Sequence, residues 1–158
     1  QVDMQRLAHL AGLVGKAHLV LDLSCRFREN AYYVVSEHWQ RFTSLRLDGA
    51  TLSALAAYCD EFLVHAVDVE GTCTGLDAGL LALLAEAAPI PTTYAGGISS
   101  MADLELVERV GRGRIDATVG SALDIFGGQG IKYSDILARF APAGRETAGG
   151  GGHREGSL

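Results

Sequence analysis

The stretch PTTYAGGISSMADLELVERVGRGRIDATVGSALDIFGG, residues 91–128, holds the pattern that decides the fold. It predicts a strand over 91–95, a serine-capped helix over 101–111 and a strand over 115–119. Each strand runs directly into glycine and then into a helix or a short helical turn. Such alternation is typical of a parallel sheet whose strands are joined by crossover helices.

The preceding residues repeat this alternation. The short apolar runs AHLVLDL (17–23) and EFLVHAV (61–67) predict two more buried strands. Four further helices are expected, over 5–14, 50–59, 77–87 and 133–140. Residues 27–43 are mixed, with one extended patch at 32–35. Four strand–helix units make half of a closed eight-stranded barrel, which needs roughly 200–250 residues. We therefore predict an α/β half-barrel over residues 1–142.

Composition and charge exclude several classes of protein. The chain has 158 residues, of which 48% are hydrophobic and 20% charged, as in a globular domain. Its 13 Lys and Arg against 19 Asp and Glu give a net charge of −6, which argues against a nucleic-acid partner. No uncharged apolar run reaches the length of about 18 residues that a membrane span needs. Any anionic ligand must therefore be held by local groups.

The remaining compositional signals concern cysteines and the chain ends. Cys25, Cys59 and Cys73 show no disulfide or zinc-ligand spacing, so we expect no metal site and a reducing compartment. The glycine-rich tail, 143–158, is expected to be disordered. Because the chain starts at Gln1, we expect it to be a piece of a longer protein.

Two glycine-containing strand ends predict a phosphate site. Gly96 and Gly97 follow one strand, and Gly120 and Ser121 follow the next. Glycine lets backbone approach a ligand closely, and amides at the start of a helix bind anions. Replacement of Gly97 by valine is expected to weaken phosphate binding while the fold survives.

Three other side chains are candidates for the same site. Asp22 lies inside or at the end of an apolar strand, where a carboxylate favours an acid–base role. Asp68 has a similar position, although helix or loop capping competes there. Trp39, the only tryptophan, either packs under a loop or stacks on a flat heterocycle. His65 lies in the middle of a strand and is expected to be a core histidine.

These motifs resemble one enzyme family. The strings LVLDLSCR, HWQ, EFLVHAVDVEG, YAGGISSMADLELV and GSALDIFGG are similar, in order and spacing, to the eukaryotic isomerases of histidine biosynthesis that act on phosphoribosylformimino-aminoimidazole-carboxamide ribotide. The resemblance covers about residues 5–140 and falls on strands five to eight of a TIM (βα)8 barrel. It implies that the chain is the C-terminal half of that barrel.

The family resemblance implies an Amadori rearrangement, in which a ribosyl aminal opens and isomerises to a ribulosyl amine. The family uses two aspartates and no cofactor. Asp22 matches the aspartate that protonates the ring oxygen, a role that a dry site favours by raising a carboxyl pKa. Gly96, Gly97, Gly120 and Ser121 match one of two phosphate sites for a bisphosphorylated substrate. The resemblance also implies a cytoplasmic location, or a plastid one in a photosynthetic organism.

The sequence departs from the family in three respects. Bacterial members have threonine where Val67 stands and arginine where Ser121 stands. The partner aspartate and the second phosphate site lie in the missing N-terminal half, so the isolated chain is expected to be inactive and to associate. Two alternatives stay open: a phosphate-binding half-barrel without isomerase activity, and the related cyclase, imidazole glycerol phosphate synthase.

Overall fold

The computed structural model describes residues 3–71 and 75–140. Cys73 and the tail 143–158, for which predictions were made above, lie outside the described residues. Within the described part, no helix is long and apolar enough to cross a membrane.

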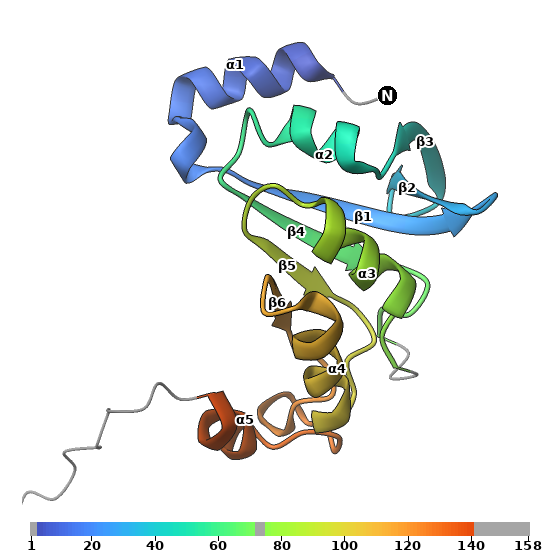
Figure 1. The fold of residues 1–158 in the computed structure, drawn as a ribbon, viewed down its shortest axis with the longest axis vertical. Coiled ribbons are helices and arrows are strands. Elements are labelled where there is room, and N and C mark those ends of the chain that lie inside the picture. Colours follow the sequence, from blue (N-terminus) through green and yellow to red (C-terminus); the bar gives the residue numbers. More distant parts are fainter. Residues whose placement is uncertain (1–2, 72–74, 141–158) are drawn as a thin grey trace, which may run out of the picture.

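A six-stranded sheet with the order β3-β2-β1-β4-β5-β6 forms the centre of the fold (Figure 1). Four of its strands are parallel, as the sequence predicts: β1 (Val20–Arg28), β4 (Glu61–Ala66), β5 (Thr92–Ala95) and β6 (Ile115–Thr118). The other two, β2 (Ala31–Ser36) and β3 (Arg41–Arg46), form an antiparallel hairpin on the last residues of β1.

The helices begin where the sequence offers a capping side chain. Asp3 caps α1 (Met4–Val14), Asp48 caps α2 (Gly49–Leu55) and Asp77 caps α3 (Ala78–Ala87), each by accepting hydrogen bonds from backbone amides of the first turn. Ser100 caps α4 (Met101–Gly111) in a reciprocal capping box with Asp103. Short helical turns η1 (Lys16–His18) and η2 (Asp124–Phe126) and a final helix α5 (Tyr133–Phe140) complete the described chain.

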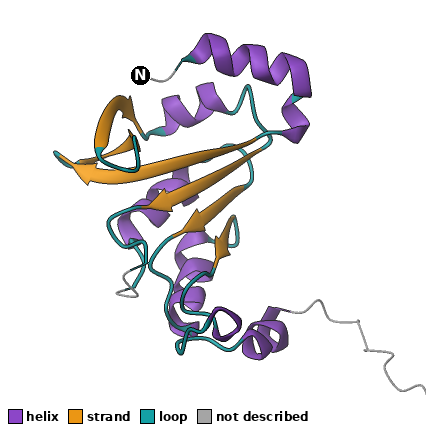
Figure 2. Ribbon diagram, turned by 180° about the vertical axis from the view of Figure 1, so that it is seen from behind, coloured by secondary structure: helices purple, strands orange, loops and turns teal. Residues whose placement is uncertain are grey.

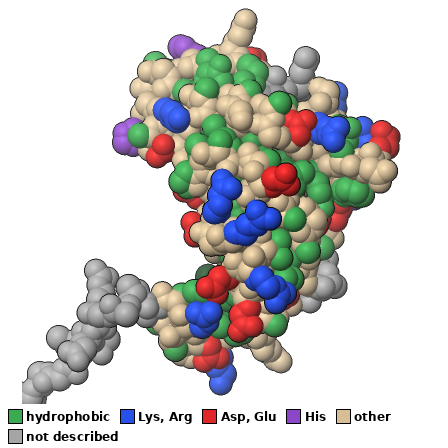
Figure 3. Space-filling view, viewed as in Figure 1, with side chains coloured by type: hydrophobic (Ala, Val, Ile, Leu, Met, Phe, Trp, Pro, Cys, Tyr) green, Lys and Arg blue, Asp and Glu red, His purple; other side chains and the backbone are tan. Residues whose placement is uncertain are grey.

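One face of the sheet is covered by helices. On the four parallel strands, alternate residues point into this apolar layer, and the most buried of them include Cys25, Phe62, Val64, Tyr94 and Ile115. Figure 3 shows the outer side of the helical layer, where charged side chains of both signs lie among apolar ones. This layer supplies the hydrophobic core that holds the parallel strands in register.

The opposite face of the sheet carries no helix among the described residues, and Figure 2 shows the strands from that side. Asp22, Leu63, Thr93 and Asp116 form one row across it, because they are register partners on β1, β4, β5 and β6. Ser24, His65, Ala95 and Thr118 form the next row, closer to the carboxyl ends of the strands. The chain therefore presents a polar, uncovered sheet face.

The sheet is not closed. Among the described residues, β6 has a neighbour on one side only, and β1 pairs with β2 only from Cys25 onward. The segment Val20–Ser24 and the whole of β6 are thus free edges at opposite sides of the parallel sheet. The α/β class and the parallel sheet are confirmed, whereas a closed barrel is not present in this chain.

Two strand predictions were wrong in part. Residues 17 and 18 are not in a strand: Lys16–His18 form a helical turn, and β1 starts at Val20 and continues to Arg28. The strand β3 was not predicted at all, although the patch 32–35 is part of β2. The hairpin pairs with the end of β1, and this pairing is what extends β1 beyond its apolar run.

Candidate active site

The side chains of Asp22 and His65 are in hydrogen-bond contact on the uncovered sheet face. The Nδ1 atom of His65 lies 2.9 Å from Oδ1 of Asp22, and the two side chains come from the neighbouring strands β4 and β1. Asp22 lies within β1 and not at its end, and its side chain is 58% exposed, against 23% for His65. In this chain Asp22 is therefore not in the dry site expected for it.

Trp39 lies beside this pair. Its indole Nε1–H donates a hydrogen bond of 3.0 Å to Oγ of Ser24, the residue opposite His65 in the β1–β4 register. Glu37, His38 and Trp39 all have positive φ angles, between 53° and 70°, and they form the turn between β2 and β3. This strained turn brings an indole from the hairpin to the sheet face that carries Asp22.

The predicted phosphate loops meet in a single small pocket of about 80 Å³. Its walls include Gly96, Gly97, Gly120 and Ser121, which the sequence singled out as a phosphate site, together with His65 and Glu70. The structure therefore brings together the two strand–glycine units that are separate in the sequence. The pocket lies at the carboxyl ends of β4, β5 and β6, the usual position of ligand sites in parallel sheets.

Several backbone amides that line this pocket are unpaired within the described structure. Within the described residues, the amides of Gly97, Ile98 and Gly120 donate no hydrogen bond. The amides of Ser99 and Ser100 do: both donate to Oδ2 of Asp103, at 2.9 Å each. An anion in the pocket would thus be met by the glycine-loop amides, because the carboxylate of Asp103 already accepts the amides of Ser99 and Ser100 just before α4.

Hydrogen bonds keep Asp103 charged. Burial alone would raise its pKa, but the hydrogen bonds from the amides and hydroxyls of Ser99 and Ser100 outweigh that effect and hold the pKa below its usual value. The negative charge of Asp103 at the start of α4 also interacts favourably with the helix dipole.

Gly96 and Gly97 are required by the backbone as well as by the pocket. Both have left-handed φ angles, +125° and +71°. A Cβ at Gly97 would overlap the carbonyl oxygen of Gly75, so the expectation that Gly97→Val leaves the fold intact is wrong. Gly120 differs, because no heavy atom lies within 4 Å of a Cβ placed there.

Asp68 takes part in a different set of contacts. Its Oδ1 atom lies 2.7 Å from Nε of Arg26, and its Oδ2 atom accepts a hydrogen bond of 3.2 Å from the amide of Phe27. These contacts tie the segment after β4 to the end of β1. A contact of Asp68 with substrate stays a prediction; its two oxygens already have partners in this chain.

Sequence reasoning missed two residues of the site, His65 and Glu70. Oε2 of Glu70 is buried without a hydrogen-bond partner in the described structure, and it is 3.2 Å from the position of a Cβ on Gly96. For His65, one signal was available: residues 61, 63 and 65 alternate with the apolar residues 62, 64 and 66, so His65 belongs to the more polar face of β4. For Glu70, which follows β4 in a loop, no such periodicity exists.

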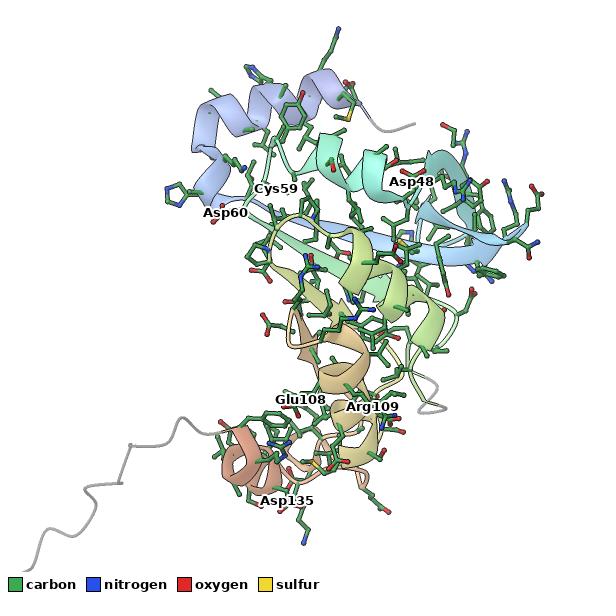
Figure 4. The ribbon with its side chains drawn as sticks, viewed as in Figure 1. Asp48, Cys59, Asp60, Glu108, Arg109 and Asp135 are labelled. Carbon is green, nitrogen blue, oxygen red and sulfur yellow. The ribbon has the colours of Figure 1, made fainter. Side chains whose placement is uncertain are left out.

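Of the two described cysteines, Cys59 lies away from this site, and Cys25 is buried in the hydrophobic core behind β1. Figure 4 shows Cys59 and Asp60 before the amino end of β4, opposite to the pocket. Cys25 and Cys59 are buried free thiols; burial raises the pKa of both, to about 12 for Cys25. Within residues 3–71 and 75–140, no three His, Cys, Asp or Glu side chains are grouped to hold a metal ion.

Comparisons with known proteins point to one enzyme. The chain is 51% identical over 138 residues to the chloroplastic 1-(5-phosphoribosyl)-5-((5-phosphoribosylamino)methylideneamino) imidazole-4-carboxamide isomerase of Medicago truncatula, covering 87% of this chain and 44% of that protein. It is 47% identical to the isomerase of the same name from Eremothecium gossypii, over 86% of this chain and 54% of the relative. It is 42% identical to the isomerase of Saccharomyces cerevisiae, over 84% of this chain and 53% of the relative.

The chain thus spans about half the length of the curated relatives it matches. The family model described as "Histidine biosynthesis protein" matches residues 2–129, which is most of the chain. By this match, the chain belongs to the histidine biosynthesis protein family.

Proposed function

We propose that this chain is the C-terminal half of an isomerase that catalyses the Amadori rearrangement in histidine biosynthesis. The observation that carries the proposal is the 40–51% identity to isomerases of one name over more than four fifths of the chain. All these relatives carry the isomerase name, so the related cyclase is not carried forward. No step calls for a metal or an organic cofactor.

The half-barrel architecture of residues 1–142 is part of this proposal. Its support is the pair of free edges, on β6 and on Val20–Ser24, which a further set of parallel strands would pair with. Apolar side chains are also exposed on α1 and α5, the first and last helices of the described chain. Leu10, Leu13 and Val14 on α1 are 44–70% exposed, and Tyr133, Leu137 and Phe140 on α5 are 44–49% exposed. Figure 1 shows α1 and α5 at opposite ends of the molecule.

A groove beside β6 also supports the proposal that a further part of the barrel packs against this chain. It measures about 640 Å³ and lies between β6, α4 and α5, with Val107, Ile115, Leu123 and Ile136 among its walls. Exposed apolar surface of this kind marks an interaction site. We propose that the missing N-terminal half of the same enzyme covers it and closes the sheet, thereby burying the face that carries Asp22.

Asp22 is the proposed general acid. It gives a proton to the ring oxygen of the ribosyl aminal while the C1–O bond breaks and the nitrogen lone pair forms a C=N bond. A base then removes the proton from C2 to give an enolamine, and this becomes the ketone when C1 gains a proton and the hydroxyl on C2 loses its proton. The second carboxylate that this sequence needs is assigned to the N-terminal half. A positioned acid or base typically contributes about 10²–10⁴-fold.

The pocket at Gly96–Gly97 and Gly120–Ser121 is the proposed site for one phosphate of the substrate. Its support is the free amides of Gly97, Ile98 and Gly120, which meet at one place. We place Trp39 and Asp68 in the substrate region as well, because both lie next to β1 on the side of Asp22. Since the pocket is formed within this chain alone, a second candidate function is phosphate binding without isomerase activity.

For localisation we propose a reducing compartment, the cytoplasm or a plastid. The free thiols of Cys25 and Cys59 support this proposal, as does the chloroplastic name of the Medicago relative.

The decisive experiment is reconstitution in trans. This chain is mixed with the N-terminal half of the Saccharomyces isomerase, and turnover of the bisphosphorylated aminal is followed. We expect activity only in the mixture. Phosphate binding by this chain with no turnover in any mixture would instead favour the non-catalytic half-barrel. Full activity of the isolated chain would contradict the assignment of the second carboxylate to another segment.

A further inference from the structure

No lysine or arginine side chain is among the described residues that line the phosphate pocket. The chain as a whole carries a net charge of −6. Sites for phosphate dianions commonly add a charge-assisted hydrogen bond from a cation to their backbone amides. A phosphate in this pocket would therefore gain from a positive charge on one of the other lining residues.

His65 is the one candidate for that charge among the lining residues. Its ring forms part of the pocket wall, and its Nδ1 atom lies 2.9 Å from Oδ1 of Asp22 on the adjacent strand. In the imidazolium form both ring nitrogens are donors, so Nδ1 donates to this carboxylate. The second ring nitrogen then also carries a hydrogen that can be donated to a ligand.

We propose that His65, held in place by Asp22, binds the phosphate as an imidazolium cation and so links the anion pocket to the proposed general acid. The inference rests on the proposed function of the pocket, which it deepens. It makes His65 a phosphate-binding and positioning residue. A phosphate bound at the second ring nitrogen would hold the imidazole ring in place, and the Nδ1 contact would in turn fix the orientation of the Asp22 carboxyl group.

The other groups that face His65 define how the proposal can be tested. Asp22 faces it from β1, and the buried carboxyl of Glu70 shares the pocket from the segment after β4. The register neighbours Ser24, Ala95 and Thr118 are uncharged, and Glu61 lies further along β4. Carboxyl groups ordinarily titrate near pH 4 and imidazoles near pH 6.5, so the range from about pH 5.5 to about pH 8 follows mainly the imidazole.

The experiment measures sulfate binding to the full chain by titration calorimetry. Sulfate stays a dianion throughout this pH range, so the probe itself does not titrate. We expect affinity to be about tenfold higher at about pH 5.5 than at about pH 8. In His65→Gln the affinity should be low at both pH values and nearly independent of pH. His18→Gln, at an exposed histidine before β1, serves as the matched control and should behave like the wild type.

Each other outcome overturns the inference in a recognisable way. If sulfate binds without pH dependence in the wild type, His65 is not the cation, although the pocket assignment stands. If Glu70→Gln removes the pH dependence and His65→Gln does not, the titrating group is Glu70. If sulfate does not bind at either pH, both the inference and the proposed phosphate pocket fail. Circular dichroism of each variant establishes that the fold is retained.

Discussion

The hydroxyl of Tyr32 donates a hydrogen bond of 2.7 Å to Oδ1 of Asp77, and this contact joins the hairpin to the start of α3. The same Oδ1 accepts the amide of Leu80, and the amide of Asp77 donates to the hydroxyl of Tyr94 on β5 at 2.8 Å. The hairpin, α3 and β5 thus meet at one capping residue. Tyr32 and Tyr94 are both almost fully buried, so this network is shielded from water.

Tyr32→Phe should therefore destabilise the chain. It leaves a partly buried carboxylate without one of its donors, which costs about 1–3 kcal/mol. Urea unfolding followed by circular dichroism measures the change in the free energy of unfolding. Tyr33→Phe is the matched control, since Tyr33 lies on the same strand and its ring still contacts Arg28 as phenylalanine. Equal stability of the two variants would show that the Tyr32–Asp77 contact adds nothing.

Alkaline pH should also destabilise the fold. Burial raises the pKa of Cys25 and of Tyr94 to about 12 each, so both groups stay protonated in the folded state. In the unfolded chain they ionise near their ordinary values of 9.0 and 10.0. The folded state then binds more protons, so its stability is complete below about pH 9 and falls as pH rises toward 12.

The measurement is the free energy of unfolding at a series of pH values above 8. Cys25→Ala should make the part of the decline that begins near pH 9 smaller without removing it, because burial also raises the pKa of Cys59, and it should leave the part that begins near pH 10. A decline of the same slope in Cys25→Ala and in the wild type between these values would contradict the assignment to Cys25.

The sequence predicts the fold well where apolar periodicity and caps agree. The helices that begin after Asp77 and Ser100 start where expected, because each capping side chain precedes an apolar run of helical period. The strands β4, β5 and β6 likewise lie within the predicted ranges, and each is followed by a loop that carries part of the site. These features rest on local chemistry alone.

The hairpin could not be predicted in the same way. Its strand β3 reads RFTSLR, which is mostly polar and partly exposed, and its turn consists of Glu37, His38 and Trp39 in left-handed conformations without glycine. Neither residue type nor period marks such a turn. The Asp22–His65 pair was missed for a related reason: alternation shows that β4 has two faces, but the register with β1 decides which side chain meets Asp22.

Asp22→Asn should abolish most turnover in the reconstituted enzyme. Asparagine retains the size and a hydrogen-bond acceptor for His65 but cannot transfer a carboxyl proton, so kcat should fall by about 10²–10⁴ with little change in KM. Asp116→Asn is the matched control, because Asp116 lies in the same row of the uncovered face, on β6. Steady-state kinetics decides the case, and a variant of Asp22 that keeps most of its turnover would falsify the role of general acid.

Gly120→Val should block the phosphate pocket and leave the fold intact. Its Cβ meets no heavy atom within 4 Å, so the new side chain occupies the space in front of the free amides and not a packed region. Calorimetry should show that binding of a phosphorylated sugar is weakened at least tenfold. Gly12→Val on α1, which is equally uncrowded, controls for the substitution itself. Undiminished affinity in Gly120→Val would mean that these glycines serve only the turn.

The isolated chain should associate through its open sides. Unpaired strand edges and exposed apolar side chains both promote association, and here Val20–Ser24 and β6 are unpaired while α1 and α5 expose apolar residues. Multi-angle light scattering should give a mass above that of the monomer of 16.7 kDa, increasing with concentration.

Leu13→Asp and Leu137→Asp, at positions 70% and 49% exposed, should shift the mass toward the monomer. Ala138→Asp, at an exposed position of α5, is the control for added charge and should change the mass less. A wild-type chain that stays monomeric at all concentrations would contradict the proposal that these surfaces are interfaces of a larger barrel.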